Sequence, residues 1–270
     1  MDGRLACADR RTSDGQRTAS SIYAVSLPAK NDLSYGGKSF IMAEDEKIEK
    51  AEKNMEREID LAEISDGRLY TAEDLVKVGC GDCAGCSSCC RETGNTILLD
   101  PYDIWQLGCG TKLSFFELLE QGRIELNMAD GVILPNLKLR ENGEGCSFLN
   151  EEGRCSIHAF RPGLCRLFPL GRIYEEGGFR YFLQVHECHK QNRSKVKVKK
   201  WLGIPDIRRY EAFVLAWHDY LKRVGGEVKC AEDEARMKEL TMSVLRLFFL
   251  LPYEENDFYG QFYERLGKGN

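Results

Sequence analysis

The chain has no apolar segment long enough to serve as a signal peptide or a membrane span. Its N-terminal stretch, MDGRLACADRRTSDG, is polar, and its most apolar run, residues 245–251, is too short to cross a bilayer. We therefore expect a cytoplasmic protein that does not partner a membrane. Because thiols stay reduced in the cytosol, clustered cysteines there are interpreted as metal ligands or redox groups before disulfides.

The chain also lacks an excess of positive charge. Its 38 Lys and Arg against 43 Asp and Glu give a net charge of −5, which argues against a general affinity for the phosphate backbone of nucleic acids. One basic run, residues 190–200, leaves a nucleic-acid-binding zinc module as an alternative, but such runs are more often solvated faces. Nucleic acid is therefore not the expected partner.

Cysteine, by contrast, is abundant, with 12 among the 270 residues. The densest group is Cys83-Ala-Gly-Cys86-Ser-Ser-Cys89-Cys90, a C-x2-C-x2-C-C block that Cys80 precedes at the same spacing. Thiolates separated by two small residues in a turn can face one ion. The same spacing matches the first three ligands of bacterial ferredoxins, although their fourth ligand is missing here. The adjacent side chains of Cys89 and Cys90 diverge, which predicts a second metal or a spare thiol.

A second group of cysteines is more widely spaced and consists of Cys146, Cys155, Cys165 and Cys188. The first three lie beside Gly, Pro or small polar residues, a setting typical of turns from which a side chain can reach inward. The alternative is that they are buried free thiols that act as small apolar groups. Taken with the dense block, they predict one metal centre assembled from distant parts of the chain.

With 43% hydrophobic residues, the chain can build a substantial core without metal. Residues 1–42 are polar and aperiodic, which predicts a disordered leader or a mis-assigned start, and a helical pattern then runs to about residue 64. We expect one domain over residues 43–270, with the cysteine motifs at 80–190 and a helical cap at 195–270.

Local signals predict mixed helices and strands around the cysteines. Thr71 opens a capping box typical of a short helix before the first block, Asp100-Pro101 begins a second helix, and Ser114 caps a third that Gly122 ends. Strands are predicted at residues 95–99 and 132–139, a hairpin at 171–185, and helices over 210–221, 240–251 and 258–266. We therefore expect an α+β fold in which loops between short strands and helices carry the ligands.

The combined motifs resemble those of a known family. They are the C-x2-C-x2-C-C block, Cys146-Ser-Phe-Leu, Gly-Arg-Cys155-Ser-Ile, and Arg161-Pro162 through Cys165-Arg-Leu-Phe-Pro169. This pattern is similar to the YkgJ-like or CxxCxxCC family of zinc- or iron-chelating domains over roughly residues 80–190. The resemblance implies metal ligation by eight cysteines: Cys83, Cys86, Cys89, Cys90, Cys146, Cys155, Cys165 and Cys188. Cys7, Cys80, Cys109 and Cys230 lie outside that set.

One residue departs from the family pattern. His158 stands where similar proteins tend to carry Tyr, so an extra nitrogen ligand is an alternative to an ordinary histidine at a turn or helix start. The fold implied here is a single cysteine-rich metal-binding domain with a helical C-terminal region.

The leading interpretation is a metal-binding protein that holds zinc or an iron–sulfur cluster, such as 4Fe-4S, in a structural, redox or sensing role. Four thiolates around each zinc would leave no open position for catalysis. The alternative function is that of a protein-lysine N-methyltransferase, because the family includes relatives of flagellin N-methylase. The residues show no methyl-donor site to support that alternative. The expected partner is the metal or cluster, with another protein as a further alternative.

Overall fold

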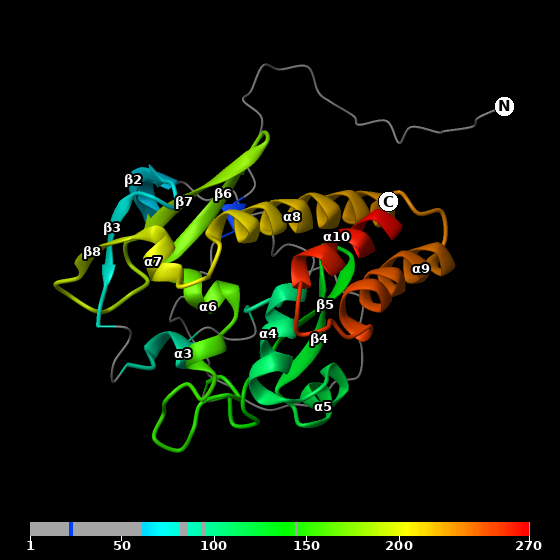
Figure 1. Cartoon of the computed structure of the whole chain (residues 1–270), viewed down its shortest axis with the longest axis horizontal. Coiled ribbons are helices and arrows are strands. Elements are labelled where there is room, and N and C mark those ends of the chain that lie inside the picture. The colour runs from blue at the N-terminus through cyan, green and yellow to red at the C-terminus, as the bar shows by residue number, and fades with distance from the viewer. Residues whose placement is uncertain (1–21, 24–60, 82–85, 93–95, 144, 270) are drawn as a thin grey trace, which may run out of the picture.

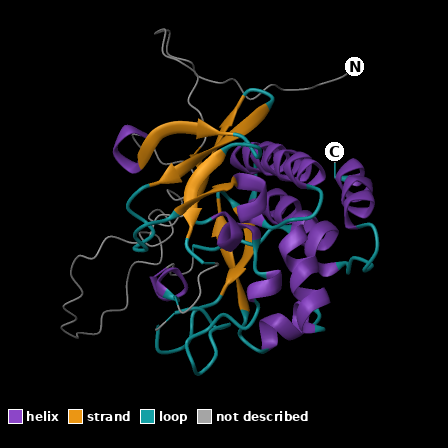
Figure 2. Ribbon diagram, turned by 60° about the vertical axis from the view of Figure 1, so that its left-hand side comes forward, coloured by secondary structure: helices purple, strands orange, loops and turns teal. Residues whose placement is uncertain are grey.

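The computed structural model describes residues 22–23, 61–81, 86–92, 96–143 and 145–269. Within these ranges short antiparallel strands combine with helices, and the C-terminal part is helical, which confirms the predicted α+β class (Figure 1, Figure 2). The strands are β1 (Ile22–Tyr23), β2 (Ser65–Tyr70), β3 (Leu75–Gly79), β4 (Ile124–Ala129), β5 (Val132–Leu137), β6 (Leu170–Glu175), β7 (Gly178–Gln184) and β8 (Ser194–Lys197). The helices are α2 (Leu61–Ile64), α3 (Ser88–Glu92), α4 (Pro101–Thr111), α5 (Phe115–Glu120), η1 (His158–Phe160), α6 (Gly163–Leu167), α7 (Val198–Leu202), α8 (Ile207–Lys229), α9 (Glu234–Leu245), η2 (Arg246–Leu250) and α10 (Phe258–Lys268).

The largest sheet is antiparallel and has the strand order β1-β6-β7-β2. At its centre β6 and β7 form a hairpin whose turn contains Gly177 at φ 78°, which confirms the hairpin predicted at residues 171–185. One face of the sheet packs Ile173 and Phe182 against α2, and the other face contributes Tyr181 to the main core. Within the predicted leader only β1 is described, and of the helix predicted from residue 42 only α2 is.

β3 and β8 form a separate two-stranded sheet that leads directly into the first cysteine block. This sheet corrects the helix predicted after Thr71. The backbone N–H of Thr71 does donate to Asp74 Oδ2 at 2.7 Å, as in a capping box, but the Thr71 hydroxyl donates to the same oxygen at 2.7 Å instead of accepting from Asp74 N–H. The chain nevertheless continues as a strand, because Val76 and Val78 alternate into the core and β8 supplies a partner edge.

β4 and β5 form the third sheet, a hairpin closed by Asp130-Gly131. Both turn residues have positive φ, 47° and 78°, a conformation that suits a type I′ turn. β5 confirms the strand predicted at residues 132–139, although it ends at Leu137. β4 was missed, even though Asp-Gly between two partly apolar runs is a signal for such a hairpin.

The strand predicted at residues 95–99 is reduced to one bridge, between Leu98 and Asn136 of β5. Leu99 N–H donates to Pro135 O at 2.8 Å, but Pro135 has no N–H to return the bond. The pairing therefore stops after one bridge, and this segment runs on into α4.

The two helices predicted from caps are present. Asp100 Oδ1 accepts from Asp103 N–H at 2.8 Å at the start of α4, and Ser114 Oγ accepts from Glu117 N–H at 3.3 Å at the start of α5. Each capping box therefore satisfies backbone donors that have no partner within the helix.

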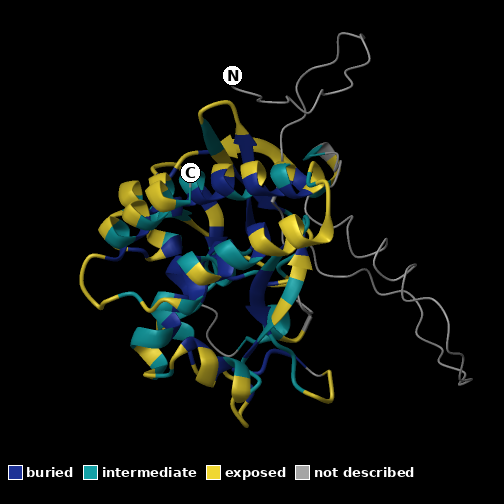
Figure 3. Cartoon of the chain, turned by 90° about the vertical axis from the view of Figure 1, so that its right-hand side faces the viewer, coloured by how far each residue is buried: buried dark blue, intermediate teal, exposed yellow. Residues whose placement is uncertain are grey.

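The C-terminal region is an aromatic-rich helical layer made by α8, α9, η2 and α10, and it confirms the three helices predicted from apolar periodicity. Its buried faces turn inward and its exposed residues lie on the outer surface (Figure 3). The rings of Phe213 and Phe262 lie 4.6 Å apart edge to face, and those of Trp217 and Phe248 lie 5.0 Å apart. Such pairs contribute about 0.5–1.5 kcal/mol each beyond the area they bury. No described helix combines the length and apolar character needed to cross a membrane.

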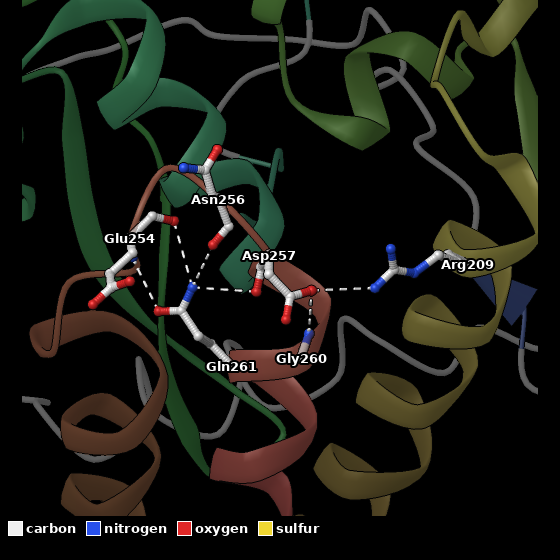
Figure 4. Close-up of polar contacts among 6 residues, drawn as sticks. All are labelled: Arg209, Glu254, Asn256, Asp257, Gly260 and Gln261. Carbon is white, nitrogen blue, oxygen red and sulfur yellow. Dashed lines mark hydrogen bonds and ion pairs between the residues drawn. The ribbon is translucent and has the colours of Figure 1, made fainter.

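Polar contacts fix the last helix onto this layer (Figure 4). Asp257 caps α10 by accepting from Gly260 N–H at 3.2 Å, and it also accepts from Arg209 Nη2 of α8 at 3.3 Å. Gln261 Nε2 donates to the carbonyls of Glu254, Asn256 and Asp257, which holds the loop that precedes the helix. The position of α10 is thus set by its cap as well as by its aromatic face.

Candidate metal centre

Six of the predicted ligands line one cavity of about 80 Å³. They are Cys86, Cys89, Cys90, Cys146, Cys155 and Cys165. A single water needs about 10–15 Å³ on this kind of measure, so the cavity has room for more than one atom. Sulfurs from both the dense block and the distant group therefore face the same space, and none of these six cysteines is in a disulfide.

A backbone contact joins the two groups. Cys146 N–H donates to Cys90 O at 2.8 Å, and Gly145 allows the close approach that this bond needs. Gly145 has φ 104°, and a Cβ there would lie 2.9 Å from Cys90 O. The glycine before Cys146 is therefore required both by backbone conformation and by the neighbouring block.

Isolated bridges hold the loop that carries Cys146 and Cys155. Leu139 pairs with Cys146, and Leu149 pairs with Cys155. Ser156 adds a further link, because its N–H donates to Phe148 O at 2.9 Å and its hydroxyl donates to the same oxygen at 2.8 Å. Two cysteines of a loop with little regular structure are thus held by main-chain pairing.

Cys165 reaches the cavity from α6, and a buried carboxylate positions this helix. Asp103 Oδ1 accepts from Gly163 N–H at 2.7 Å and so satisfies a donor at the first turn of α6. Burial raises the pKa of Asp103 to about 6. The same residue completes the capping box of α4, so α4 and α6 are joined through one side chain.

Three of the predicted ligands lie on short helices, and the other described ones lie outside helices. Cys89 and Cys90 belong to α3 and Cys165 to α6, which corrects the expectation that loops carry every ligand. The physical reason is local: Arg91 N–H donates to Ser87 O, and Arg166 N–H donates to Pro162 O, so each segment closes a helical turn.

The other described cysteines do not line this cavity. Cys188 is half-buried in the loop after β7, and Cys83 lies outside the described residues, as does Cys7. Cys80 follows β3, Cys109 lies on α4, and Cys230 is exposed after α8. Among the described residues, no three Cys, His, Asp or Glu side chains lie close enough to share one metal ion.

Most of the cavity thiols are in surroundings that favour the protonated form. Burial raises the pKa of Cys165 well above its usual range and that of Cys146 to about 11. Hydrogen bonding with Cys90 and burial together raise the pKa of Cys89. Cys86 is the exception, because the backbone N–H of Ser88 lowers its pKa. Deprotonation of the buried thiols at neutral pH thus requires a cation.

Cationic side chains at the cavity favour deprotonation of these thiols. Arg154 and Arg161 line the cavity, whereas the described lining includes no Asp or Glu. Both arginines belong to the family motifs quoted from the sequence, but neither was predicted as a cavity cation. His158 begins η1, and its Nε2 lies against Arg161 Nη1.

An apolar wall completes the cavity and was also missed. It includes Ile97, Leu137, Leu164 and Phe168, together with Trp201 of α7. Trp201 Nε1 donates to Phe168 O at 3.2 Å, which fixes the indole ring at the edge of the cavity. A low-dielectric wall of this kind strengthens electrostatic interactions inside the site.

Comparison with known proteins identifies the segment that holds these residues. Residues 82–193 match the model of the CxxCxxCC family, which is described as a putative zinc- or iron-chelating domain. The matched segment covers less than half of the chain and contains all eight predicted ligands, which confirms the resemblance to this family found in the sequence. Zinc or iron binding is the activity that the family supports. Comparison with curated proteins and with solved structures finds no match.

Proposed function

We propose that the cysteine-lined cavity is the metal centre of the CxxCxxCC domain, and that the eight predicted cysteines hold zinc or an iron–sulfur cluster there. One observation carries this proposal: six described cysteines from separate segments line the same small cavity. Thiolate sulfur is the ligand that both zinc and iron–sulfur clusters take, so the donor set fits either group. Cys83 and Cys188 complete the set in this proposal.

Metal binding in this cavity is coupled to proton release. Because burial keeps the thiols of Cys146 and Cys165 protonated, each must lose a proton when it binds the metal. Arg154 and Arg161 offset part of the negative charge that thiolates bring. Metal affinity should therefore fall as the pH is lowered. In this proposal the thiols also move closer together when they bind the metal.

The identity of the metal determines the role. Four thiolates close a zinc site, so two such sites would use all eight cysteines and serve to stabilise the loops. An iron–sulfur cluster would instead give the domain a redox or sensing role, because its potential responds to hydrogen bonds and solvent near the sulfurs. Arginine and apolar side chains both line the cavity, which suits a buried charged centre.

Elemental analysis of protein purified without oxygen, together with its visible spectrum, tests the proposal. We expect zinc without visible absorbance, or iron and sulfide in comparable amounts with brown colour. Protein that folds fully and contains neither metal would overturn the proposal.

A pair of matched variants tests which cysteines act as ligands. Cys165→Ser should reduce the metal content, since α6 presents this sulfur to the cavity. Cys109→Ser is the control, because Cys109 is also partly buried on a helix and burial raises its pKa too, yet it lies outside the cavity. Equal metal content in the two variants, both folded, would contradict the assignment of Cys165.

A further inference from the structure

A second, larger cavity shares a wall with the cysteine cavity. Its volume is about 500 Å³, and His158, Arg161 and Trp201 line both spaces. The rest of its lining comes from the end of β3, from β8, and from α6 and α7, including Arg166, Ser194 and Lys200. Small-molecule sites in proteins have volumes of about 300–1,000 Å³, so the space suits an organic ligand.

The described charged residues that line this second cavity are all basic. Arg161, Arg166 and Lys200 line it, and no Asp or Glu is found among its described lining residues. This contrasts with the chain as a whole, in which acidic residues outnumber basic ones. Cations gathered in a concave site attract anions by focusing the electric field.

Arg166 is held in place by the backbone. Its Nε donates to Arg161 O at 2.9 Å, and its Nη2 donates to Ala159 O at 2.7 Å. Within the described residues Arg166 makes no ion pair. Burial, and then the nearby charge of Arg161, lower its pKa. Two guanidinium groups are therefore held close together, and an anion between them would reduce their repulsion.

Lys200 differs from its neighbours on the same segment. Lys197 and Lys199 both pair with Glu73, at 3.1 and 2.6 Å. Lys200 is exposed and forms no ion pair with any residue that the structure describes. Its ammonium group thus remains available at the cavity.

The remaining walls suit the body of a ligand. Trp201 Nε1 is already used on Phe168 O, so the indole ring offers carbon surface rather than a hydrogen-bond donor. Gly79 and Gly81 also line the cavity, and Ser194 Oγ donates to Gly79 O at 3.4 Å. A ligand with an acidic group beside the three cations and a flat apolar group beside Trp201 would match both the charge and the apolar surface of the cavity.

We propose that this cavity binds a small organic anion, with its carboxylate or phosphate group held by Arg161, Arg166 and Lys200. The binding claim does not require a metal. Its placement beside a metal centre rests on the function proposed above, because the shared wall of Arg161 and Trp201 would bring the ligand next to that centre.

Calorimetric titration of the full chain tests the proposal with four probes. Phenyl phosphate and benzoate carry the two kinds of anionic group, and phenol and benzyl alcohol are their uncharged counterparts. We expect saturable binding of at least one anion, weakened by salt and absent for its uncharged counterpart. Binding of neither anion, or equal binding of an anion and its counterpart, would overturn the proposal.

Lys200→Glu should weaken anion binding about tenfold or more, because it replaces an attracting charge with a repelling one. Lys195→Glu is the matched control: Lys195 is exposed on the adjacent strand β8 and does not line the cavity. An equal loss in both variants would show a general charge effect and contradict the site.

Metal content measured in the same samples separates this proposal from the previous one. Lys200→Glu should retain wild-type metal content, and Cys165→Ser should retain anion binding if it stays folded. Loss of anion binding in a folded Cys165→Ser protein would overturn the claim that the anion site forms without the metal. Absence of metal from wild-type protein that binds the anion would overturn only the proposed metal centre.

Discussion

The cysteine-lined loops and the C-terminal helices reach their structures by different means. The helices α8, α9 and α10 bury one apolar face each, and their aromatic rings meet at the short distances seen between Phe213 and Phe262. The loops around the cavity have short elements and depend on single contacts, such as Cys146 N–H to Cys90 O. Many small packing terms support the helices, whereas a few specific bonds and, in our proposal, a metal support the loops.

The largest expected effect is in the helical region. Phe213→Ala removes a fully buried ring and should reduce the free energy of unfolding by about 3–5 kcal/mol. Urea unfolding followed by circular dichroism measures it. Metal bound per folded molecule should stay unchanged if the two regions are separately supported. Phe116→Ala, at a ring that is 57% exposed, is the control and should cost far less.

The next largest effect should come from the contact between the cysteine groups. Gly145→Ala places a Cβ 2.9 Å from Cys90 O at φ 104°, so we expect a loss of about 2–3 kcal/mol and a lower metal content. Unfolding curves and elemental analysis measure the two results. Gly143→Ala is the control, since its φ is 71° and no atom lies within 4 Å of a Cβ there. Similar losses in both variants would mean that the contact with Cys90 matters little.

A pH-dependent effect is expected at the joint between α4 and α6. Burial raises the pKa of Asp103 to about 6, from about 3.9 in an unfolded chain. The ionised form of Asp103 therefore destabilises the folded protein. This destabilisation is absent below pH ~4, increases between pH ~4 and ~6, and reaches its full value above pH ~6.

Asp103→Asn removes this cost, and its amide oxygen can still accept from Gly163 N–H. The amide nitrogen that replaces Oδ2 cannot accept from Asp100 N–H, but that loss does not depend on pH. Unfolding measured from pH 4 to 8 should show the wild type losing on the order of 1–2 kcal/mol relative to the variant as the pH rises. Asp219→Asn, at an exposed carboxylate on α8, controls for the loss of one negative charge. A constant difference between wild type and Asp103→Asn across this range would contradict the role of burial.

The smallest effect is expected at the surface. Lys112 and Glu255 pair at 3.1 Å between α4 and the loop before α10, and both side chains are mostly exposed. Glu255→Gln should change the free energy of unfolding by less than about 1 kcal/mol, and less still at high salt. Glu254→Gln is the neighbouring control. A change in the free energy of unfolding above about 2 kcal/mol would show that surface charge, rather than packing, holds the loop before α10 against α4.

Local signals were reliable where they needed only neighbours along the chain. Asp100, Ser114 and Gly177 lie at the caps and turn that their residue types predicted. Thr71 shows the limit of such signals: its backbone N–H bonds to Asp74 as predicted, but β8 supplies an edge that makes the next segment a strand. A partner that far along the chain cannot be found from local pattern.

The sequence likewise predicted one part of the candidate site and missed another. Residue type and spacing were enough to select the cysteines and the family, because clustered thiols that stay reduced serve mainly to bind metals. Arg161 and Trp201 were missed as cavity residues, since a lone Arg and a lone Trp carry no spacing that indicates a site. The expected loop positions of Cys89, Cys90 and Cys165 were corrected by helical turns too short to give a periodic signal.

The sequence alone determined the class of chemistry and those helices and turns that local signals fix. Both depend on residue type and on contacts within one or two turns of chain. Only the tertiary structure decided that Cys90 meets Cys146, that α6 is fixed by Asp103, and that Arg161 and Trp201 separate two cavities. These depend on side chains packed from distant segments, whose positions follow from the whole core rather than from any one stretch.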